Sequence, residues 1–119
     1  MSFEEIRAGL SEQREIVVEE RHVVTHTRTP VLSTPQMISM MERVAMDLAQ
    51  LHLPAGFTTV GYEVHIRHKA PAILGSTVTV STRLLEVEGR RLLFEVRVTQ
   101  GEKLIGEGIH RRTIIQIPE

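Results

Sequence analysis

The stretch "VLSTPQMISMMERVAMDLAQ", residues 31–50, decides the fold, because its apolar residues recur with the period of a long amphipathic helix. At its start we expect Thr34 to be the N-cap and Pro35 the first helical residue. Pro54 and Gly56 follow the stretch and end the helix. The apolar stripe consists of Met37, Met40, Met41, Val44, Ala45 and Leu48. The segment therefore predicts a helix that buries one face.

Beyond the helix the apolar period changes from 3.6 to 2, which is typical of strands. In "TTVGYEVHIRH", residues 58–68, strict alternation divides the side chains between two faces. One face carries Val60, Tyr62, Val64, Ile66 and His68, and the other carries Gly61, Glu63, His65 and Arg67. Three further alternating runs, 76–88, 90–100 and 102–117, are separated by glycines, which predicts hairpin turns.

Ahead of the helix, residues 13–26 are rich in valine and charge and predict a first strand, while residues 1–10 predict an N-terminal arm or short helix. The order is therefore strand, helix and four strands. This order predicts an α+β fold, with one long helix on one face of an antiparallel sheet of about five strands. The length of 119 residues predicts a single domain, 1–119. Because one helix leaves apolar surface uncovered, we also expect a homodimer.

Composition excludes several classes of function. The net charge of −1 gives no electrostatic case for nucleic acid or an anionic membrane, and aromatic residues make up only 3% of the chain. The absence of cysteine excludes disulfides, thiolate metal sites and a cysteine nucleophile. No stretch has the length and hydropathy of a membrane span or a signal peptide, so the expected location is cytoplasmic.

Two side chains stand out because both lean toward the predicted core. Glu42 lies about 100° from Met41 around the helix, at the edge of the apolar stripe. His68 continues the apolar face of its strand, whereas His65 lies on the face expected to meet solvent. Singly, Glu42 could be a boundary residue whose head reaches water, and His68 could be bonded to a backbone carbonyl. As a pair they indicate a site, because a buried charge needs a partner.

Thr34 adds a hydroxyl at the start of the same helix, but about 12 Å of helical rise separates it from Glu42. We therefore expect a substrate or a second subunit to connect these two residues. A metal site is not expected, because His22 and His26 would be about 13 Å apart along a strand. The arginines near strand ends predict a solvated surface: Arg90, Arg91, Arg111 and Arg112.

The chain resembles the hotdog-fold proteins, and more narrowly the fluoroacetyl-CoA thioesterase group, over residues 15–117. The resemblance lies in "VLSTP" before the helix, in "TVGYEVHIRHKAP" after it, and in "LGSTVTVSTRLLEVEGRRLLFEVRV" further downstream. The spacing of Thr34, Glu42 and His68 matches the threonine, glutamate and histidine triad of that group. Gly61 matches its active-site glycine.

The resemblance implies a long helix wrapped by a curved sheet, and a dimer with active sites near the interface. It also implies hydrolysis of an acyl-CoA thioester, with coenzyme A as part of the substrate and no separate cofactor. Glu42 would be the nucleophile or the base that activates water. His68 would move protons or assist the leaving thiolate, and Thr34 would orient the carboxylate or substrate. Gly61 and Ser33 would contact the substrate.

The chain departs from the group in one segment. Fluoroacetyl selectivity there is linked to phenylalanines in a lid ahead of the helix, and the corresponding segment "HTRTPVLSTP", residues 26–35, has none. We therefore expect another small or medium acyl group. Two alternatives remain: a module that binds acyl-CoA without turnover, and a hotdog hydratase or dehydratase.

Overall fold

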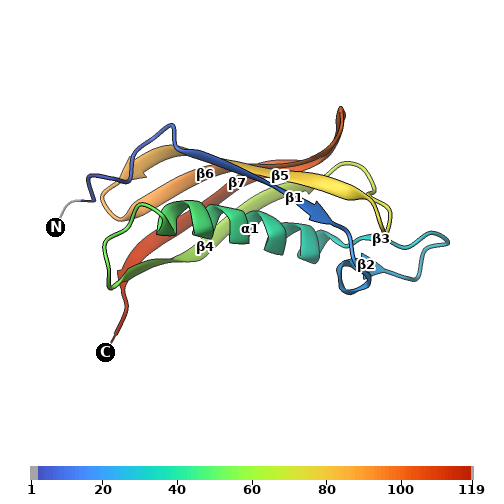
Figure 1. Cartoon of the computed structure of the whole chain (residues 1–119), viewed down its shortest axis with the longest axis horizontal. Helices are drawn as coiled ribbons and strands as arrows, with labels where there is room; N and C mark the ends of the chain where they lie inside the picture. The colour runs from blue at the N-terminus through green and yellow to red at the C-terminus, as the bar shows by residue number, and fades with distance from the viewer. Residues whose placement is uncertain (1–2, 119) are drawn as a thin grey trace.

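The structure, a computed structural model, describes residues 3–118 and places one long α-helix across an antiparallel sheet (Figure 1). The elements are β1 (Ser11–Val17), the 3-10 turn η1 (Glu20–His22), β2 (Val23–Val24), β3 (Val31–Leu32), α1 (Thr34–Gln50), β4 (Phe57–His68), β5 (Thr77–Glu88), β6 (Arg91–Gln100) and β7 (Lys103–Gln116). Within the described residues the main sheet has five strands in the order β1-β5-β6-β7-β4. The predicted α+β fold is confirmed.

Helix α1 begins one residue earlier than its predicted start signal. Ser33 is the N-cap, since its Oγ accepts a hydrogen bond from the backbone N–H of Gln36 at 3.2 Å. Thr34 is the first helical residue and Pro35 the second, so the prediction that Thr34 caps the helix is wrong. The shift leaves the Thr34 hydroxyl available for another partner.

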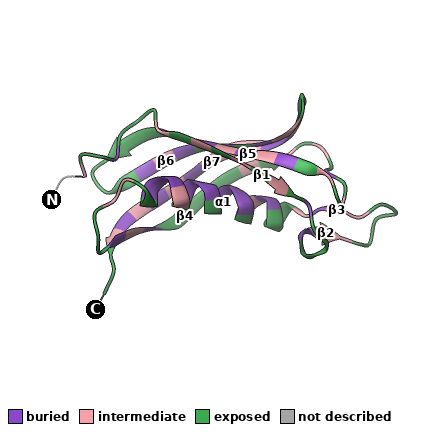
Figure 2. Ribbon diagram, in the orientation of Figure 1, coloured by how far each residue is buried: buried purple, intermediate pink, exposed green. Residues whose placement is uncertain are grey.

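The core lies between α1 and the inner face of the sheet, where Figure 2 shows buried residues along the helix and the strands. The predicted helix stripe is buried throughout, together with Ala49. From the sheet come Val78, Val80, Thr82 and Leu84 of β5 and Leu92, Phe94, Val96 and Val98 of β6, all buried as the alternation predicts. Phe94 is fully buried, and truncating such a phenylalanine to alanine costs about 3–5 kcal/mol of stability.

The first predicted strand, residues 13–26, is interrupted in the structure. β1 ends at Val17, and the buried Val18 bonds through its backbone to Gly75 and Ser76. The chain then turns through η1, where the Nδ1 atom of His22 accepts a hydrogen bond from the Glu19 backbone N–H at 2.9 Å. The capping bond and the burial of Val18 favour a turn over a continued strand. Residues 3–10 form turns.

Strand β4 contains a β-bulge that changes its alternation. Gly61 pairs with Arg112 and Glu63 pairs with Arg111, so Tyr62 is an extra residue without a partner in β7. Before the bulge, Phe57 and Thr59 are buried, so Gly61, two residues further on, lies on the same inner face. After the bulge, His68 lies on the inner face, where it contacts Thr34. The single predicted face from Val60 to His68 is therefore wrong. Val60 lies on the opposite face and is 43% exposed.

In the described part of the chain, β4 and β1 form the two edges of the sheet, so β4 has a strand neighbour on one side only. The apolar side chains of Val60, Tyr62 and Val64 are exposed along it. Among residues 3–118 no helix is both long and apolar enough to cross a membrane.

Candidate active site

The structure brings together two of the predicted site residues, Thr34 and His68. The hydroxyl of Thr34, at the start of α1, lies 2.8 Å from Nδ1 of His68, at the end of β4. Because Ser33 caps the helix, the Thr34 hydroxyl is free to make this bond. Nε2 of His68 is the one buried side-chain nitrogen or oxygen among the described residues without a hydrogen-bond partner. The hydrogen-bonding capacity of that atom is therefore unused within one protomer.

A surface cavity of about 500 Å³ adjoins this pair. Its wall is largely apolar, with Val24, Leu32 and Pro35 among its residues, and Ser33 also lies on it. His26 and Lys69 add polar groups at the cavity. A mainly apolar cavity with a few placed polar atoms is typical of a small-molecule site.

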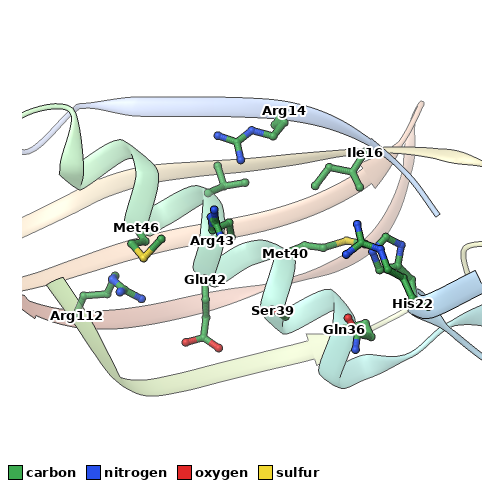
Figure 3. Close-up of a pocket in the computed structure, with 12 residues that line it drawn as sticks. Arg14, Ile16, His22, Gln36, Ser39, Met40, Glu42, Arg43, Met46 and Arg112 are labelled. Atoms are coloured by element: carbon green, nitrogen blue, oxygen red, sulfur yellow. The ribbon is translucent and has the colours of Figure 1, made fainter. Parts of the chain in front are cut away.

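Glu42 lies at a separate cluster. Among the described residues it makes no hydrogen bond or ion pair with Thr34 or His68; its Oε2 atom lies 3.9 Å from Nε2 of His110. The Glu42 side chain is 41% exposed and borders a second cavity, of about 510 Å³, together with Ser39 and Met46. Figure 3 shows Glu42 projecting from α1 toward β4, on the far side of the helix from Arg14.

The backbone of Gly61 lies close to the Glu42 carboxylate. A Cβ atom at this position would lie 3.0 Å from Oε2 of Glu42, 2.8 Å from Cε1 of His110 and 3.2 Å from Nη1 of Arg112. Such distances are too short for a side chain, so glycine is required by space and not by backbone conformation. Gly61 therefore lies beside Glu42 rather than beside His68.

Arg112, predicted from the sequence to lie on a solvated surface, is a buried residue of this cluster. Arg112 is only 5% exposed, because alternation along β7 places His110, Arg112 and Ile114 on the inner face. Its Nε donates to the Thr59 hydroxyl at 2.7 Å, Nη2 to the Thr59 carbonyl at 2.9 Å, and Nη1 to His110 at 3.1 Å. In an alternating strand, His110 and Arg112 share a face with Ile114. That apolar residue was the sequence signal that could have predicted that both are buried.

The other three arginines do lie at the surface. Arg90 and Arg91 are exposed, and Arg111 forms an ion pair with Glu63 at 2.7 Å on the outer face. His65, also predicted to face solvent, is 66% exposed and lies 3.2 Å from Glu63. The solvated reading is therefore correct for these residues and wrong for Arg112 alone.

The electrostatics of the Glu42 cluster follow from its burial. Burial lowers the pKa of His110, the hydrogen bond to the Glu63 carbonyl raises it, and the charge of Arg112 lowers it further. The net effect keeps the imidazole neutral near pH 7. Burial also lowers the pKa of Arg112, while the nearby Glu42 carboxylate raises it. Arg112 is the cation of this cluster, because a guanidinium keeps its proton in proteins.

One long helix across a five-stranded antiparallel sheet, with a threonine–histidine pair at the helix start, defines a hotdog-fold protein. The family described as fluoroacetyl-CoA-specific thioesterase matches residues 13–117 of the chain. The chain belongs to this family, as the resemblance in its sequence indicated.

Individual relatives agree with this assignment. The fluoroacetyl-CoA thioesterase of Streptantibioticus cattleyicolor is 34% identical over 87 residues, which cover 73% of this chain and 63% of that protein. The chain thus spans less than two thirds of that relative's length. A structure of the fluoroacetyl-CoA thioesterase FlK has a TM-score of 0.86 and 30% identity, over 94% of this chain and 90% of that one. A hot-dog-like protein from Thermanaerovibrio acidaminovorans has a TM-score of 0.88 and 25% identity, over 98% and 89%.

Proposed function

We propose that this protein hydrolyses an acyl-CoA thioester to a carboxylic acid and free coenzyme A. The observation that carries the proposal is the contact of Thr34 with His68, which fixes the imidazole of a residue that lines an apolar cavity and leaves its Nε2 atom without a partner. Family membership supports it, and a variant of FlK has been solved with fluoroacetate and CoA. A cytoplasmic location, expected from the sequence, stays part of this proposal.

The proposal includes a homodimer whose active sites each use both protomers. Within one protomer about 12 Å of helical rise separates Thr34 from Glu42, and among the described residues their polar contacts go to different histidines, His68 and His110. The open edge of β4 offers a route to a second copy, since an unpaired edge strand with exposed apolar residues favours further strand pairing. A two-fold symmetric dimer would use the same edge twice.

Antiparallel pairing of two β4 strands around an axis near His65 would lay the His68 end of one strand beside Gly61 of the other. The Thr34–His68 pair of one protomer would then meet Glu42 of its partner. This arrangement explains why the three residues fall into two clusters in a single chain.

Hydrolysis in such a site has two possible routes. With Glu42 as base, the carboxylate removes a proton from water, and the oxygen adds to the thioester carbonyl carbon. The tetrahedral intermediate then collapses, the C–S bond breaks, and His68 delivers a proton to the departing thiolate. With Glu42 as nucleophile, its oxygen attacks the carbonyl and expels the thiolate, and water then cleaves the resulting anhydride.

The acyl group is proposed to be small or medium and not fluoroacetyl. Residues 24–35 line much of the cavity beside His68 without any phenylalanine. The polar His26 lies there instead. The segment therefore lacks the aromatic side chains to which the group's fluoroacetyl selectivity is linked.

The test is thiol release from a series of acyl-CoA thioesters of increasing chain length. We expect turnover by the unaltered protein and by the control His52→Ala, which lies after the C-terminal end of α1 and lines neither cavity. Glu42→Gln and His68→Ala should lose turnover while acyl-CoA binding stays measurable. Binding without turnover by the unaltered protein would instead favour the non-catalytic module, and hydration of an enoyl-CoA without thiol release would favour a hydratase.

A further inference from the structure

His110 is a buried histidine that the proposed mechanism does not use. It lies in β7 on the inner face of the sheet, 1% exposed, and its ring is stacked at a centroid distance of 6.4 Å on Phe94 of β6. Both ring nitrogens are bonded: Nδ1 lies 3.0 Å from the Glu63 carbonyl, and Nε2 lies 3.1 Å from Nη1 of Arg112. A buried imidazole with two directional bonds is more than packing volume.

The two partners fix which nitrogen carries the proton. A carbonyl oxygen only accepts, so Nδ1 of His110 must donate its hydrogen to Glu63. A guanidinium only donates, so Nε2 must be the unprotonated acceptor for Arg112. The geometry thus admits the neutral Nδ1–H tautomer and excludes both the other tautomer and the imidazolium. The 3.9 Å approach of Nε2 to Glu42 is therefore not an ion pair.

Burial is the largest cause that shifts the pKa of His110; of the two charged groups that face the ring, Arg112 lowers this pKa and Glu42 raises it, and the net direction is downward, as this assignment requires. Arg112 of β7 and Glu42 of α1 face it, β4 contributes the backbone carbonyl of Glu63, and β6 contributes the apolar Phe94. A proton on Nε2 would point directly at the Arg112 cation. Burial, which lowers the pKa of His110, acts in the same direction.

The bond from His110 completes the support of the Arg112 guanidinium. Thr59 accepts from Nε and Nη2, and His110 accepts from Nη1, so each nitrogen has one fixed partner. Nη1 of Arg112 and Oε2 of Glu42 both border the space above Gly61. The position of Nη1 relative to the Glu42 carboxylate therefore depends on His110.

We propose that His110 is a positioning residue, which as the neutral Nδ1–H tautomer holds the Arg112 guanidinium beside Glu42. It acts on the reaction through that cation and does not touch the substrate. This inference rests on the proposed function, because the reaction it supports is the one assigned to Glu42.

A matched pair of variants separates positioning from packing. In His110→Gln the side-chain oxygen can reach the place of Nε2 and accept from Arg112. In His110→Asn the amide can still donate to Glu63 but does not reach Arg112. We expect His110→Asn to lower kcat about tenfold with little change in KM, and His110→Gln to retain most activity. Thermal unfolding of both variants monitors stability, and equal losses of kcat in the two would overturn the proposal.

A double-mutant cycle tests whether His110 acts through Arg112. In the Arg112→Ala background, His110→Asn should have little further effect on kcat/KM, because the group it positions is already gone. Full additivity of the two changes would contradict the proposal.

A third measurement needs no substrate. The ring ¹⁵N signals of His110 should show a protonated Nδ1 and an unprotonated Nε2 that stay unchanged from pH 8 to pH 6. An Nε2–H ring, or one that titrates near pH 6.5, would overturn the inference even in an active enzyme. If the ring is Nδ1–H but the protein hydrolyses no acyl-CoA, the proposed function and the catalytic part of this inference are overturned. The conclusion that His110 holds the Arg112 guanidinium in place would still stand.

Discussion

Gly61 and His68 lie on the same face of β4 although seven residues separate them. In a regular strand an odd separation places two side chains on opposite faces. The bulge at Tyr62 adds one residue on the β4 side of the pairing with β7, so that both positions face α1. The bulge thus puts the glycine beneath Glu42 and the histidine beside Thr34 on one inner face.

Mixing two inactive variants tests whether each site uses both protomers. Glu42→Gln and His68→Ala, refolded together, should form heterodimers in which one site is intact, because Glu42 of one chain meets His68 of the other. Statistical assembly predicts about a quarter of the activity of the unaltered protein, because half of the dimers are mixed and each of these has one intact site of two. Thiol release after mixing measures it. Sites contained within one protomer would give no activity in the mixture.

Substitutions at Ser33 should affect the stability of the fold, and substitutions at Thr34 should affect activity. Ser33→Ala removes the N-cap and should cost about 1 kcal/mol of unfolding free energy. Thr34→Val removes the bond to His68 and should lower kcat about tenfold with little loss of stability, whereas Thr34→Ser should keep both. Chemical denaturation and thiol-release kinetics check the pair. A large loss of stability in Thr34→Val would show that Thr34, and not Ser33, caps α1.

Gly61→Ala should impair both the fold and the site. The added methyl group would press on Glu42, His110 and Arg112 at distances of 2.8–3.2 Å. Overpacking of this kind costs about 1–3 kcal/mol of stability, and we expect kcat to fall because Glu42 is displaced. Val17→Ala, which changes a half-exposed residue on the other edge strand, β1, is the control and should keep normal kinetics. Normal turnover in Gly61→Ala would mean that the Glu42 carboxylate can move without cost to catalysis.

Stability should fall as the pH is lowered from 7 to 5. The folded state depresses the pKa of His110, so the unfolded chain takes up a proton near pH 6.5 while the folded protein does not. The stability that the protein gains from keeping His110 neutral is fully present above pH 6.5. It decreases as the pH falls, by at most about 1.4 kcal/mol per pH unit for one histidine. Urea unfolding at several pH values measures this slope, which should be shallower in His110→Gln.

Two exposed carboxylates act in a different pH range. The hydrogen bond with His65 lowers the pKa of Glu63, and the hydrogen bond from Lys69 lowers that of Glu107. Their stabilising effect is present above the ordinary value of 4.5 and is lost only as the pH falls below it. An unchanged slope between pH 7 and pH 5 in His110→Gln would therefore assign that slope to another histidine.

Much of the fold could be predicted because it is encoded in local periodicity. The stripe of α1 and the alternation of β5 and β6 are properties of neighbouring residues, and the structure buries the faces that these patterns predict. Glu42 could be singled out in the same way, as a charge at the edge of an apolar stripe. Local patterns failed at Val18 and at Tyr62, where a turn and a bulge interrupt the period.

The sequence by itself determined the helix, the strands, the turns between them and the residues with the chemistry for a site. Only the tertiary structure decided which of those residues meet: Thr34 with His68, and Glu42 with Gly61, His110 and Arg112. The reason is physical, since a bulge arises from the pairing of two strands that are distant in the sequence, here of Glu63 with Arg111, and cannot be predicted from one strand alone. Arg112 can likewise be buried only because other residues accept the hydrogen bonds of its guanidinium: Thr59 on the neighbouring strand β4, and His110 on the same strand, β7.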